Sequence, residues 1–219
     1  MTGSGAAARR DYGGQTASAR TEARRAKLVE AGLELFGTVG VRGTSVRGVL
    51  RESGVGERYF YESFDSVEDL LIAVGVEVQR KVKDAVLESL ATLEDPTIID
   101  MCRAGLLAMA VSLTEDPRFL RVAMVETIGV SEKVTSSRSE LVDWFVDLVV
   151  ASTVANGPIP PASARIFALA LVGAANEVLV RWAAGTVPVD MPTVVEHLLV
   201  LFWGTLDYAE ALCVVAEPS

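Results

Sequence analysis

The residues whose types and spacing most suggest a chemistry lie between Gly40 and Phe64. Glu57-Arg-Tyr-Phe-Tyr61 places an acid, a base and two phenols on what reads as one short helix. Phe60 and Phe64, four residues apart, suffice as its buried side. The remaining side chains are unusually bulky for a helix turn that only meets solvent. The segment predicts a binding surface rather than a packing face.

The elements that would position this surface are two short helices joined by a tight glycine turn, the layout of a helix-turn-helix. Gly40 and Gly43 bracket a first turn, and Thr44 stands where an N-cap residue belongs. Gly54 is expected to end the helix that follows. The apolar stripe of that helix consists of Val46, Val49 and Leu50.

The ordered set of these motifs resembles the TetR/AcrR family of one-component bacterial transcriptional regulators. The match covers roughly residues 20–72. The motifs that carry it are Glu34-Leu-Phe36, Gly40 to Thr44, Gly54-Val55, Phe60-Tyr61, Phe64 and Glu68-Asp-Leu-Leu71. A glycine turn before one helix would be weak evidence, whereas this ordered spacing is specific. Three merely packed helices of an all-α protein are the alternative interpretation.

The resemblance implies that one group of residues contacts DNA: Thr44, Ser45, Glu57, Arg58, Tyr59 and Tyr61. Thr44 and Tyr61 would contact phosphates, which position a protein without reading sequence. Residues at the start of the recognition helix would face base edges. There Arg58 can bind guanine O6 and N7, Glu57 can accept from a cytosine amine, and Tyr59 can pack on a thymine methyl.

The sequence departs from the family pattern at one position. Val67 stands where relatives usually carry a lysine, so one phosphate contact is expected to be missing. Several acids, which repel a polyanion, surround the recognition helix, namely Glu62, Asp65, Glu68 and Asp69. These features favour weaker DNA affinity at physiological salt.

The charge of the chain is divided unevenly. Residues 1–60 hold ten Lys and Arg against six Asp and Glu, whereas residues 61–219 hold ten against 23. The net charge of −9 argues against non-specific binding of the whole molecule to nucleic acid or anionic membrane. The basic charge lies with the expected DNA-binding region. Arg9 and Arg10 form part of a basic arm, residues 1–19, that is expected to be disordered and solvated, although such arms also reach minor grooves.

Motifs for catalysis or metal binding are missing from the sequence, which has one histidine, His197, and two distant cysteines, Cys102 and Cys213. We therefore expect no enzyme activity, no metal and no cofactor. A signal peptide and an uninterrupted apolar run of membrane-spanning length are also absent from the sequence. A cytoplasmic protein without a membrane partner is the expectation.

The residues after 66 read as successive helices. A long helix starts after Ser66, and further helices are expected to start at Asp95-Pro96, Asp116-Pro117 and Ser131. Asn156-Gly-Pro-Ile-Pro-Pro161 is a break. The last two helices, about 163–184 and 192–215, are apolar nearly all round, which predicts burial in a core or against a partner.

Three rows of residues on those last helices are expected to matter for assembly. The apolar rows are Phe167, Leu171 and Ala175; Ala170, Ala174, Val178 and Trp182; and Leu198, Leu201, Phe202, Thr205, Leu206 and Ala209. In the resembled family the two final helices form a four-helix homodimer interface. The alternative is that both are interior helices of a monomer. A dimer would place two recognition helices about 34 Å apart, in successive major grooves.

The resemblance also implies an effector pocket between about residues 96 and 182. Met and aromatic side chains suit an apolar ligand, and they predict a lining of Met101, Met109, Phe119, Met124, Trp144, Asn176 and Trp182. Each of these is also a plausible core residue. Glu126 and Glu177, like Asn176, interrupt apolar faces and could orient a polar ligand group. Glu177 can instead pair with Arg181 at i+4.

Together these observations predict an all-α protein with an N-terminal three-helix DNA-binding domain, residues 20–65, and a larger helical effector-binding and dimerisation domain, residues 66–219. The expected function is a dimeric transcriptional regulator, a repressor in the manner of the resembled family, that binds a near-palindromic DNA operator and is released by a small, largely apolar effector. The alternative is a ligand-binding or scaffolding dimer with a weakened DNA reader.

Overall fold

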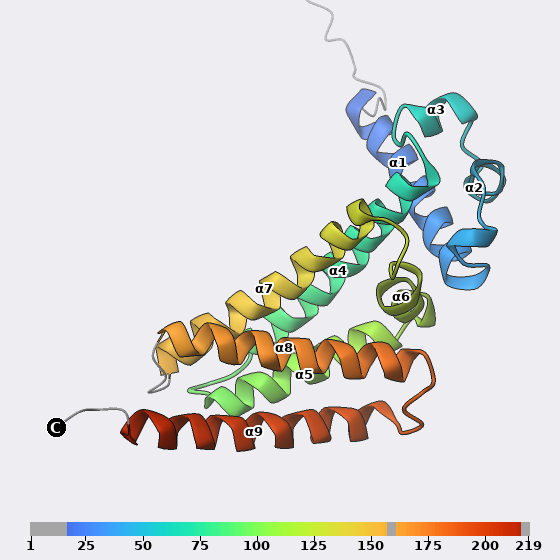
Figure 1. The fold of residues 1–219 in the computed structure, drawn as a ribbon. Coiled ribbons are helices and arrows are strands. Elements are labelled where there is room, and N and C mark those ends of the chain that lie inside the picture. The colour runs from blue at the N-terminus through green and yellow to red at the C-terminus, as the bar shows by residue number, and fades with distance from the viewer. Residues whose placement is uncertain (1–16, 157–160, 216–219) are drawn as a thin grey trace, which may run out of the picture.

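The computed structural model describes residues 17–156 and 161–215, which form helices joined by short turns (Figure 1). The all-α fold is confirmed. In chain order the elements are α1 (Ala17–Thr38), the 3-10 turn η1 (Val41–Gly43), α2 (Val46–Ser53), α3 (Glu57–Tyr61), α4 (Val67–Ala91), α5 (Ile98–Thr114), α6 (Pro117–Arg121), the π-helical segment η2 (Val122–Glu126), α7 (Glu132–Asn156), α8 (Pro161–Ala183) and α9 (Met191–Val215). The expected basic arm lies largely outside the described residues.

Helices α1, α2 and α3 gather at one end of the molecule around a small core (Figure 1). The predicted stripe of α2 faces inward, with Val49 fully buried and Val46 and Leu50 half-buried. Phe60 is fully buried and Phe64 nearly so, as their spacing predicts. This local core fixes the orientation of α2 and α3 against α1.

The N-cap of α2 is Ser45 rather than the predicted Thr44. The Ser45 hydroxyl accepts a hydrogen bond from the Gly48 N–H at 3.2 Å. Thr44 instead closes the η1 turn, because its hydroxyl donates to the Gly40 carbonyl at 2.8 Å. The turn thus uses the first of the two hydroxyls, and the helix begins one residue later than expected.

Gly54 ends α2 as predicted, in the left-handed conformation with φ of 65°. A residue with a Cβ is strained at this φ, whereas glycine adopts it freely. The chain can therefore reverse within three residues and start α3 at Glu57. This tight reversal places α3 beside α1, at the end of the molecule opposite α8 and α9 (Figure 1).

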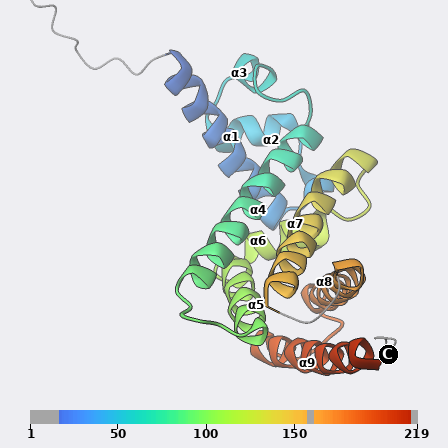
Figure 2. The same cartoon turned by 90° about the vertical axis from the view of Figure 1, so that its left-hand side faces the viewer.

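The long helix α4 leads out of the three-helix end and supports the other helices (Figure 2). Its N-cap is Ser66, whose hydroxyl accepts from the Asp69 N–H at 3.1 Å, as predicted. Its buried side chains follow helical periodicity: Leu70, Leu71, Val74, Val78, Val82 and Val86. α4 packs on α5 and α7, which in turn pack on α9 and α8.

The start of α5 differs from the prediction. The helix begins at Ile98, two residues after Pro96, because Thr97 and Asp100 form a capping box. Asp95 has a φ of 52° and belongs to the preceding turn. The expected starts at Asp116-Pro117 and after Ser131, and the two final helices, agree with α6, α7, α8 and α9 to within about two residues.

The rows predicted for assembly on α8 and α9 differ in burial: Ala170 and Leu201 are exposed, Ala174, Val178 and Trp182 are half-buried, and Thr205, Leu206 and Ala209 lie outside the residues whose side chains the structure describes. Phe167, Leu171 and Ala175 are buried, as are Leu198 and Phe202. The large apolar side chains exposed on the two helices are Ile166, Leu169, Val200, Leu201 and Trp203, of which only Leu201 belongs to a predicted row. Both helices are apolar on more than one side, so periodicity alone could not tell the inner face from the outer one.

Helix α8 is long and apolar enough to span a membrane over Ser163–Ala183, and it alone is so within the described residues. One such helix is also what the core of a helical bundle contains. Its buried side chains Ala164, Ala168 and Leu179 lie within the packing of α8 on α7 and η2.

Candidate functional site: a recognition helix and an apolar cavity

The outer face of α3 carries the polar and aromatic residues that the sequence singled out. Glu57 and Arg58 are exposed, and the Tyr59 and Tyr61 side chains remain 40% and 51% exposed. Tyrosine usually buries most of its ring, so two open phenols on one turn are unusual for packing. Their hydroxyls and the charged groups are free to meet an external partner.

Arg58 forms an ion pair with Glu62 one turn along α3, Nε to Oε1 at 3.0 Å, while its side chain remains 86% exposed. An ion pair this exposed contributes little to stability. Its effect is to hold the guanidinium, through Nε, beside the next turn of α3. The guanidinium must turn from Glu62 in order to use both N–H edges on a base.

Tyr59 is held from α1. The guanidinium of Arg24 lies 4.3 Å from the centre of the Tyr59 ring, a cation–π contact, and Arg24 Nη2 donates to the Thr21 hydroxyl at 3.0 Å. The contact joins α1 to the first turn of α3. It positions Tyr59 for a partner without burying its hydroxyl.

Thr44 and Ser45 lie on the same side of the three-helix end but differ in exposure. Thr44 is half-buried with its hydroxyl donating to Gly40, whereas Ser45 is exposed at the N-terminus of α2. A hydroxyl at a helix N-terminus, beside free N–H groups, suits a phosphate oxygen. The DNA-binding roles given to both residues stay predictions.

Sequence reasoning missed a basic face on α2. Arg47 and Arg51 are both exposed there, and Arg42 is exposed on η1 just before it. Their i, i+4 spacing was the available signal, since it places both guanidiniums on one side of the helix. These cations, beside α3, supply positive charge that a phosphate backbone requires.

The acids expected to repel DNA are partly neutralised. Lys133 of α7 pairs with Asp69, and its hydrogen bond, helped by the one from Ser66, holds the pKa of the Asp69 carboxyl below its ordinary value. Glu68 accepts a hydrogen bond from the Ser131 hydroxyl at 2.7 Å. Val67, which precedes Glu68, packs half-buried on the core. The first turn of α4 is therefore bonded to the start of α7.

An apolar cavity of about 110 Å³ lies between α4, α5, α7, α8 and α9. Its walls are aliphatic, aromatic and thioether groups, with few polar ones. Four of the predicted ligand-binding residues line it: Met101, Met109, Met124 and Asn176. A dry cavity with adaptable methionines can admit an apolar molecule.

Three predicted lining residues lie elsewhere. Phe119 of α6 is buried against α4, with the Lys81 ammonium 4.5 Å from its ring centre. Trp144 stacks edge-on against Phe145, which takes the expected place in the cavity wall. Trp182 donates from Nε1 to the Val189 carbonyl at 2.7 Å, which closes the turn after α8. The sequence alone does not show which of two neighbouring aromatic residues, Trp144 or Phe145, faces the cavity.

A second cavity of about 50 Å³ adjoins the first on the side of α4. Both are lined by Met109, Met124, Leu141, Val142 and Asn176. The second has polar groups that the first lacks, including Gln79 and Arg138. Arg138 Nη2 donates to Asn176 Oδ1 at 2.9 Å.

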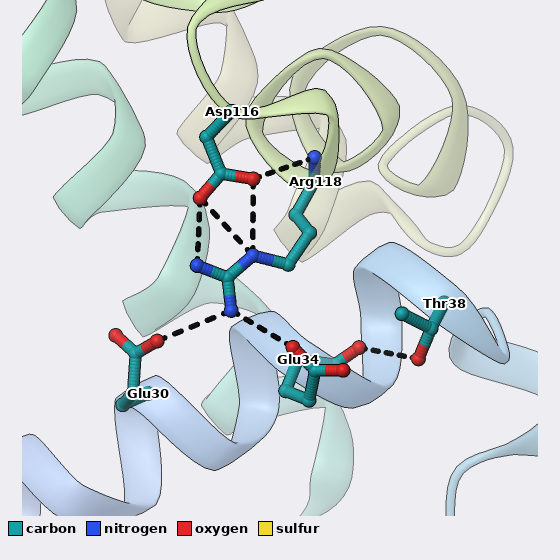
Figure 3. Close-up of polar contacts among 5 residues, drawn as sticks. All are labelled: Glu30, Glu34, Thr38, Asp116 and Arg118. Carbon is teal, nitrogen blue, oxygen red and sulfur yellow. Dashed lines mark hydrogen bonds and ion pairs between the residues drawn. The ribbon is translucent and has the colours of Figure 1, made fainter.

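The junction between α1 and α6 is polar and densely bonded. Arg118 of α6 bonds Asp116 at 2.6 Å and reaches across to Glu34 at 2.8 Å and Glu30 at 3.2 Å on α1 (Figure 3). Hydrogen bonds from the guanidinium lower the pKa of the Asp116 carboxyl. Gly37 leaves no spare room, since a Cβ there would lie 2.5 Å from Arg118 Cβ and 2.9 Å from its Cα.

A second bond pattern joins η2 to the turn before α2. Glu126, expected to orient a ligand, instead accepts from the Val41 N–H at 2.8 Å and from Arg121 Nε at 3.0 Å. Arg121 also donates to the Thr38 carbonyl at 2.8 Å. Met124, two residues before Glu126, lines both cavities. One five-residue segment therefore contacts the cavity and the helix-turn-helix. Glu177 pairs with Arg181 at 2.6 Å, as its spacing predicts.

Comparisons with known proteins agree with this geometry. Residues 28–74 match the family model of bacterial regulatory proteins of the tetR family. The matched segment runs from α1 through α3 into α4, which are the elements that present the exposed face. No curated protein sequence matches the chain.

Solved structures resemble the whole arrangement at low identity. The fatty acid degradation regulator FadR from Bacillus halodurans has a TM-score of 0.70 at 16% identity, over 82% of this chain and 94% of that one. FadR from Bacillus subtilis, solved with stearoyl-CoA, has 0.66 at 15%, over 81% and 96%. A TetR transcriptional regulator from Chloroflexus aurantiacus has 0.60 at 17%, over 83% and 94%. The helix-turn-helix region of this chain therefore matches the tetR family of bacterial regulatory proteins, and the chain has the fold of these solved regulators.

Proposed function

We propose that the chain is a dimeric, cytoplasmic, one-component transcriptional regulator, most simply a repressor, that binds a near-palindromic DNA operator and is released by a small, largely apolar effector. The observation that carries this proposal is the outer face of α3, where Arg58, Tyr59 and Tyr61 are exposed beside the basic residues of α2. That face has the shape and chemistry of a major-groove reader.

The cavity supports an effector-controlled regulator. Met124 in the cavity wall and Glu126 on the Val41 N–H belong to the same π-helical segment. A ligand that moved Met124 would also move Glu126, and through the bond of Glu126 to the Val41 N–H it would move the turn that leads into α2. An effector that binds one arrangement of η2 better would shift the population toward it, and a coupling of about 1–3 kcal/mol changes operator affinity 5- to 150-fold.

The exposed apolar residues of α8 and α9 support the homodimer. Ile166 and Val200 are each 72% exposed, and Trp203 is 58% exposed. An uncovered patch of this kind marks an interaction surface. A second copy would cover it and would double the DNA-binding ends, which a palindromic operator requires.

The bound ligand of the Bacillus subtilis neighbour does not transfer to this chain. A cavity of about 110 Å³ is far below the ~300–1,000 Å³ of drug-sized ligand sites. Stearoyl-CoA would need a much larger opening. The effector of this chain is proposed to be smaller.

The test of the proposal is a selection of bound duplexes from a random DNA pool with the purified full chain at low salt. Enrichment of a near-palindrome, with half-sites about one helical turn apart, is expected. Arg58→Ala should lose preference at one base position in each half-site, whereas Arg165→Ala, on the remote helix α8, should not. A folded dimer that enriches no sequence would refute the operator.

The second candidate is a ligand-binding dimer with a weakened reader, favoured by the Arg58–Glu62 ion pair and by the apolar Val67. Salt separates the two candidates. Operator binding should fall steeply with salt concentration, because each neutralised phosphate releases counterions. A dimer that binds ligand tightly and DNA at no salt concentration would support the second candidate.

A further inference from the structure

The two cavities are chemically unlike, although Asn176 lies in the wall of both. The larger one is enclosed by side chains such as Leu106, Leu148 and Val149. The smaller one adds the polar groups of Gln79, Thr127, Ser137 and Arg138. The two cavities adjoin, one lined almost wholly by apolar groups and the other with added polar groups.

Arg138, in the wall of the smaller cavity, lacks a carboxylate partner within the described residues. Its one hydrogen bond goes to Asn176 Oδ1, which leaves most of its five N–H donors unused. The other arginines from α4 onward each pair with an acid: Arg80, Arg103, Arg118, Arg121, Arg165 and Arg181. Arg138 is also half-buried, where an unpaired cation is unfavourable.

Asn176 adds further donors at the same place. Because arginine can only donate, its bond fixes the oxygen of the Asn176 amide toward Arg138, so the amide NH2 faces the other way. Within the described residues no acceptor bonds that NH2. Two donor groups with spare N–H bonds thus meet where the two cavities adjoin.

Gly75 of α4 leaves open space beside these donors. It lines the smaller cavity, and a Cβ built on it would meet nothing within 4 Å. Met109 and Met124 separate the two cavities, and their unbranched thioether chains can rotate aside at small cost. The space can therefore be joined and enlarged without moving the backbone.

From this geometry we propose that the two cavities together bind one amphipathic carboxylate, with its anionic group on Arg138 and Asn176 and its hydrocarbon part among the apolar walls of the larger cavity. The single unpaired guanidinium matches the single charge of a carboxylate. The small volumes of about 110 and 50 Å³ match a short chain or one ring. This inference deepens the proposed function, because it names the chemical class of its effector.

The binding experiment uses titration calorimetry on the full-length protein with two matched pairs of probes. Octanoate is compared with 1-octanol, and 4-phenylbutanoate with 4-phenyl-1-butanol. Hydrogen bonds to charged groups contribute about 1.5–3 kcal/mol, so each acid is expected to bind roughly ten- to a hundredfold tighter than its alcohol.

Arg138→Gln should abolish the preference for the acids and leave alcohol affinity within about twofold, because the apolar walls are unchanged. Arg165→Gln is the matched control, an arginine on α8 that already pairs with Asp147. It should retain the full preference for the acids. Leu148→Trp, which fills the larger cavity, should weaken acids and alcohols alike. Circular dichroism of each variant establishes that it is folded.

The inference is overturned if neither acid binds, if acid and alcohol bind equally, or if the preference survives Arg138→Gln. Operator release is measured separately by fluorescence anisotropy. An acid that binds through Arg138 but leaves DNA bound supports the site and refutes effector release. Alcohols that bind and release DNA as well as the acids do support the proposed function and overturn the inference.

Discussion

The two ends of the molecule leave opposite kinds of side chain uncovered. At the α3 end the exposed residues are Arg58, Tyr59 and Tyr61, above a local core that is complete within one subunit. At the α8–α9 end the exposed residues include Ile166 and Trp203, so apolar side chains there extend from the buried core to the surface. One end is suited to a charged, hydrated partner and the other to an apolar one. The difference assigns a separate kind of partner to each end.

The largest expected effect comes from placing a charge on the apolar end. Trp203→Asp should dissociate the dimer, because a central interface tryptophan typically contributes about 2–4 kcal/mol. Analytical ultracentrifugation measures the change. Leu87→Asp on α4, at a similarly exposed leucine, is the control and should remain dimeric. A Trp203→Asp variant that sediments like the unmodified protein would remove α9 from the interface.

A change at the polar end should act on DNA and leave assembly intact. Arg58→Ala should cost about 1–3 kcal/mol of operator affinity and relax one base position per half-site. Anisotropy titrations against the selected operator and point variants of it measure both effects. Equal affinity for all of these duplexes before and after the substitution would show that Arg58 does not read a base.

Between the two ends, the Arg118 junction should matter for stability. Arg118→Ala leaves Asp116, Glu30 and Glu34 without their shared cation and should lower the free energy of unfolding by about 1–2 kcal/mol, allowing for partial exposure. Arg118→Lys should lose less. Urea unfolding at neutral pH gives both values. Similar stability for the Ala and Lys variants would mean that the charge contributes nothing.

The same junction predicts a pH dependence. Arg118 lowers the pKa of Asp116 in the folded state, so its stabilisation is present above the unfolded pKa of about 3.9 and is lost as pH falls toward the folded value. Stability of the unmodified protein should therefore fall more steeply below about pH 4 than that of Arg118→Ala. Parallel acid-dependence curves would assign the loss to other carboxyls.

The smallest expected effect is a gain. Gly75→Ala should stabilise the fold by about 0.5–1 kcal/mol, because alanine favours a helix interior and its Cβ enters open space. Thermal unfolding reports it. Gly105→Ala, whose Cβ would lie 3.7 Å from a Val86 methyl, is a matched substitution on α5. A destabilised Gly75→Ala variant would show that α4 and α7 already close over this space.

Sequence predicted the polar end well because its signals are local. Glycine turns, a hydroxyl cap and the Phe60–Phe64 spacing each act within a few residues, and only the exact cap, Ser45 in place of Thr44, was wrong. The apolar end carries no such signals. A helix that is apolar on several sides does not show which side faces inward, so two rows of α8 were predicted for assembly, and the row of Phe167, Leu171 and Ala175 is buried within the subunit.

The cavity lining was predicted only in part. Met101, Met109, Met124 and Asn176 were predicted by residue type, whereas Trp144 and Phe145 exchanged places. Contacts between distant segments could not be predicted. The hydrogen bonds from the Val41 N–H to Glu126 and from Arg118 to Glu34 join residues more than 80 positions apart, and no pattern in the sequence indicates them. Such pairs depend on tertiary packing alone.

Gly37 lies in the last turn of α1, where the three-helix end meets α6, and it limits which side chains this position can carry. Its backbone touches Arg118 so closely that even a methyl group would collide with main-chain atoms of α6. Overpacking of this kind costs about 1–3 kcal/mol and cannot be relieved by rotating a side chain. In a library of all substitutions selected for regulation, glycine at position 37 should therefore be nearly invariant. Variants that fail there should do so because α1 and α6 move apart, although each helix remains folded.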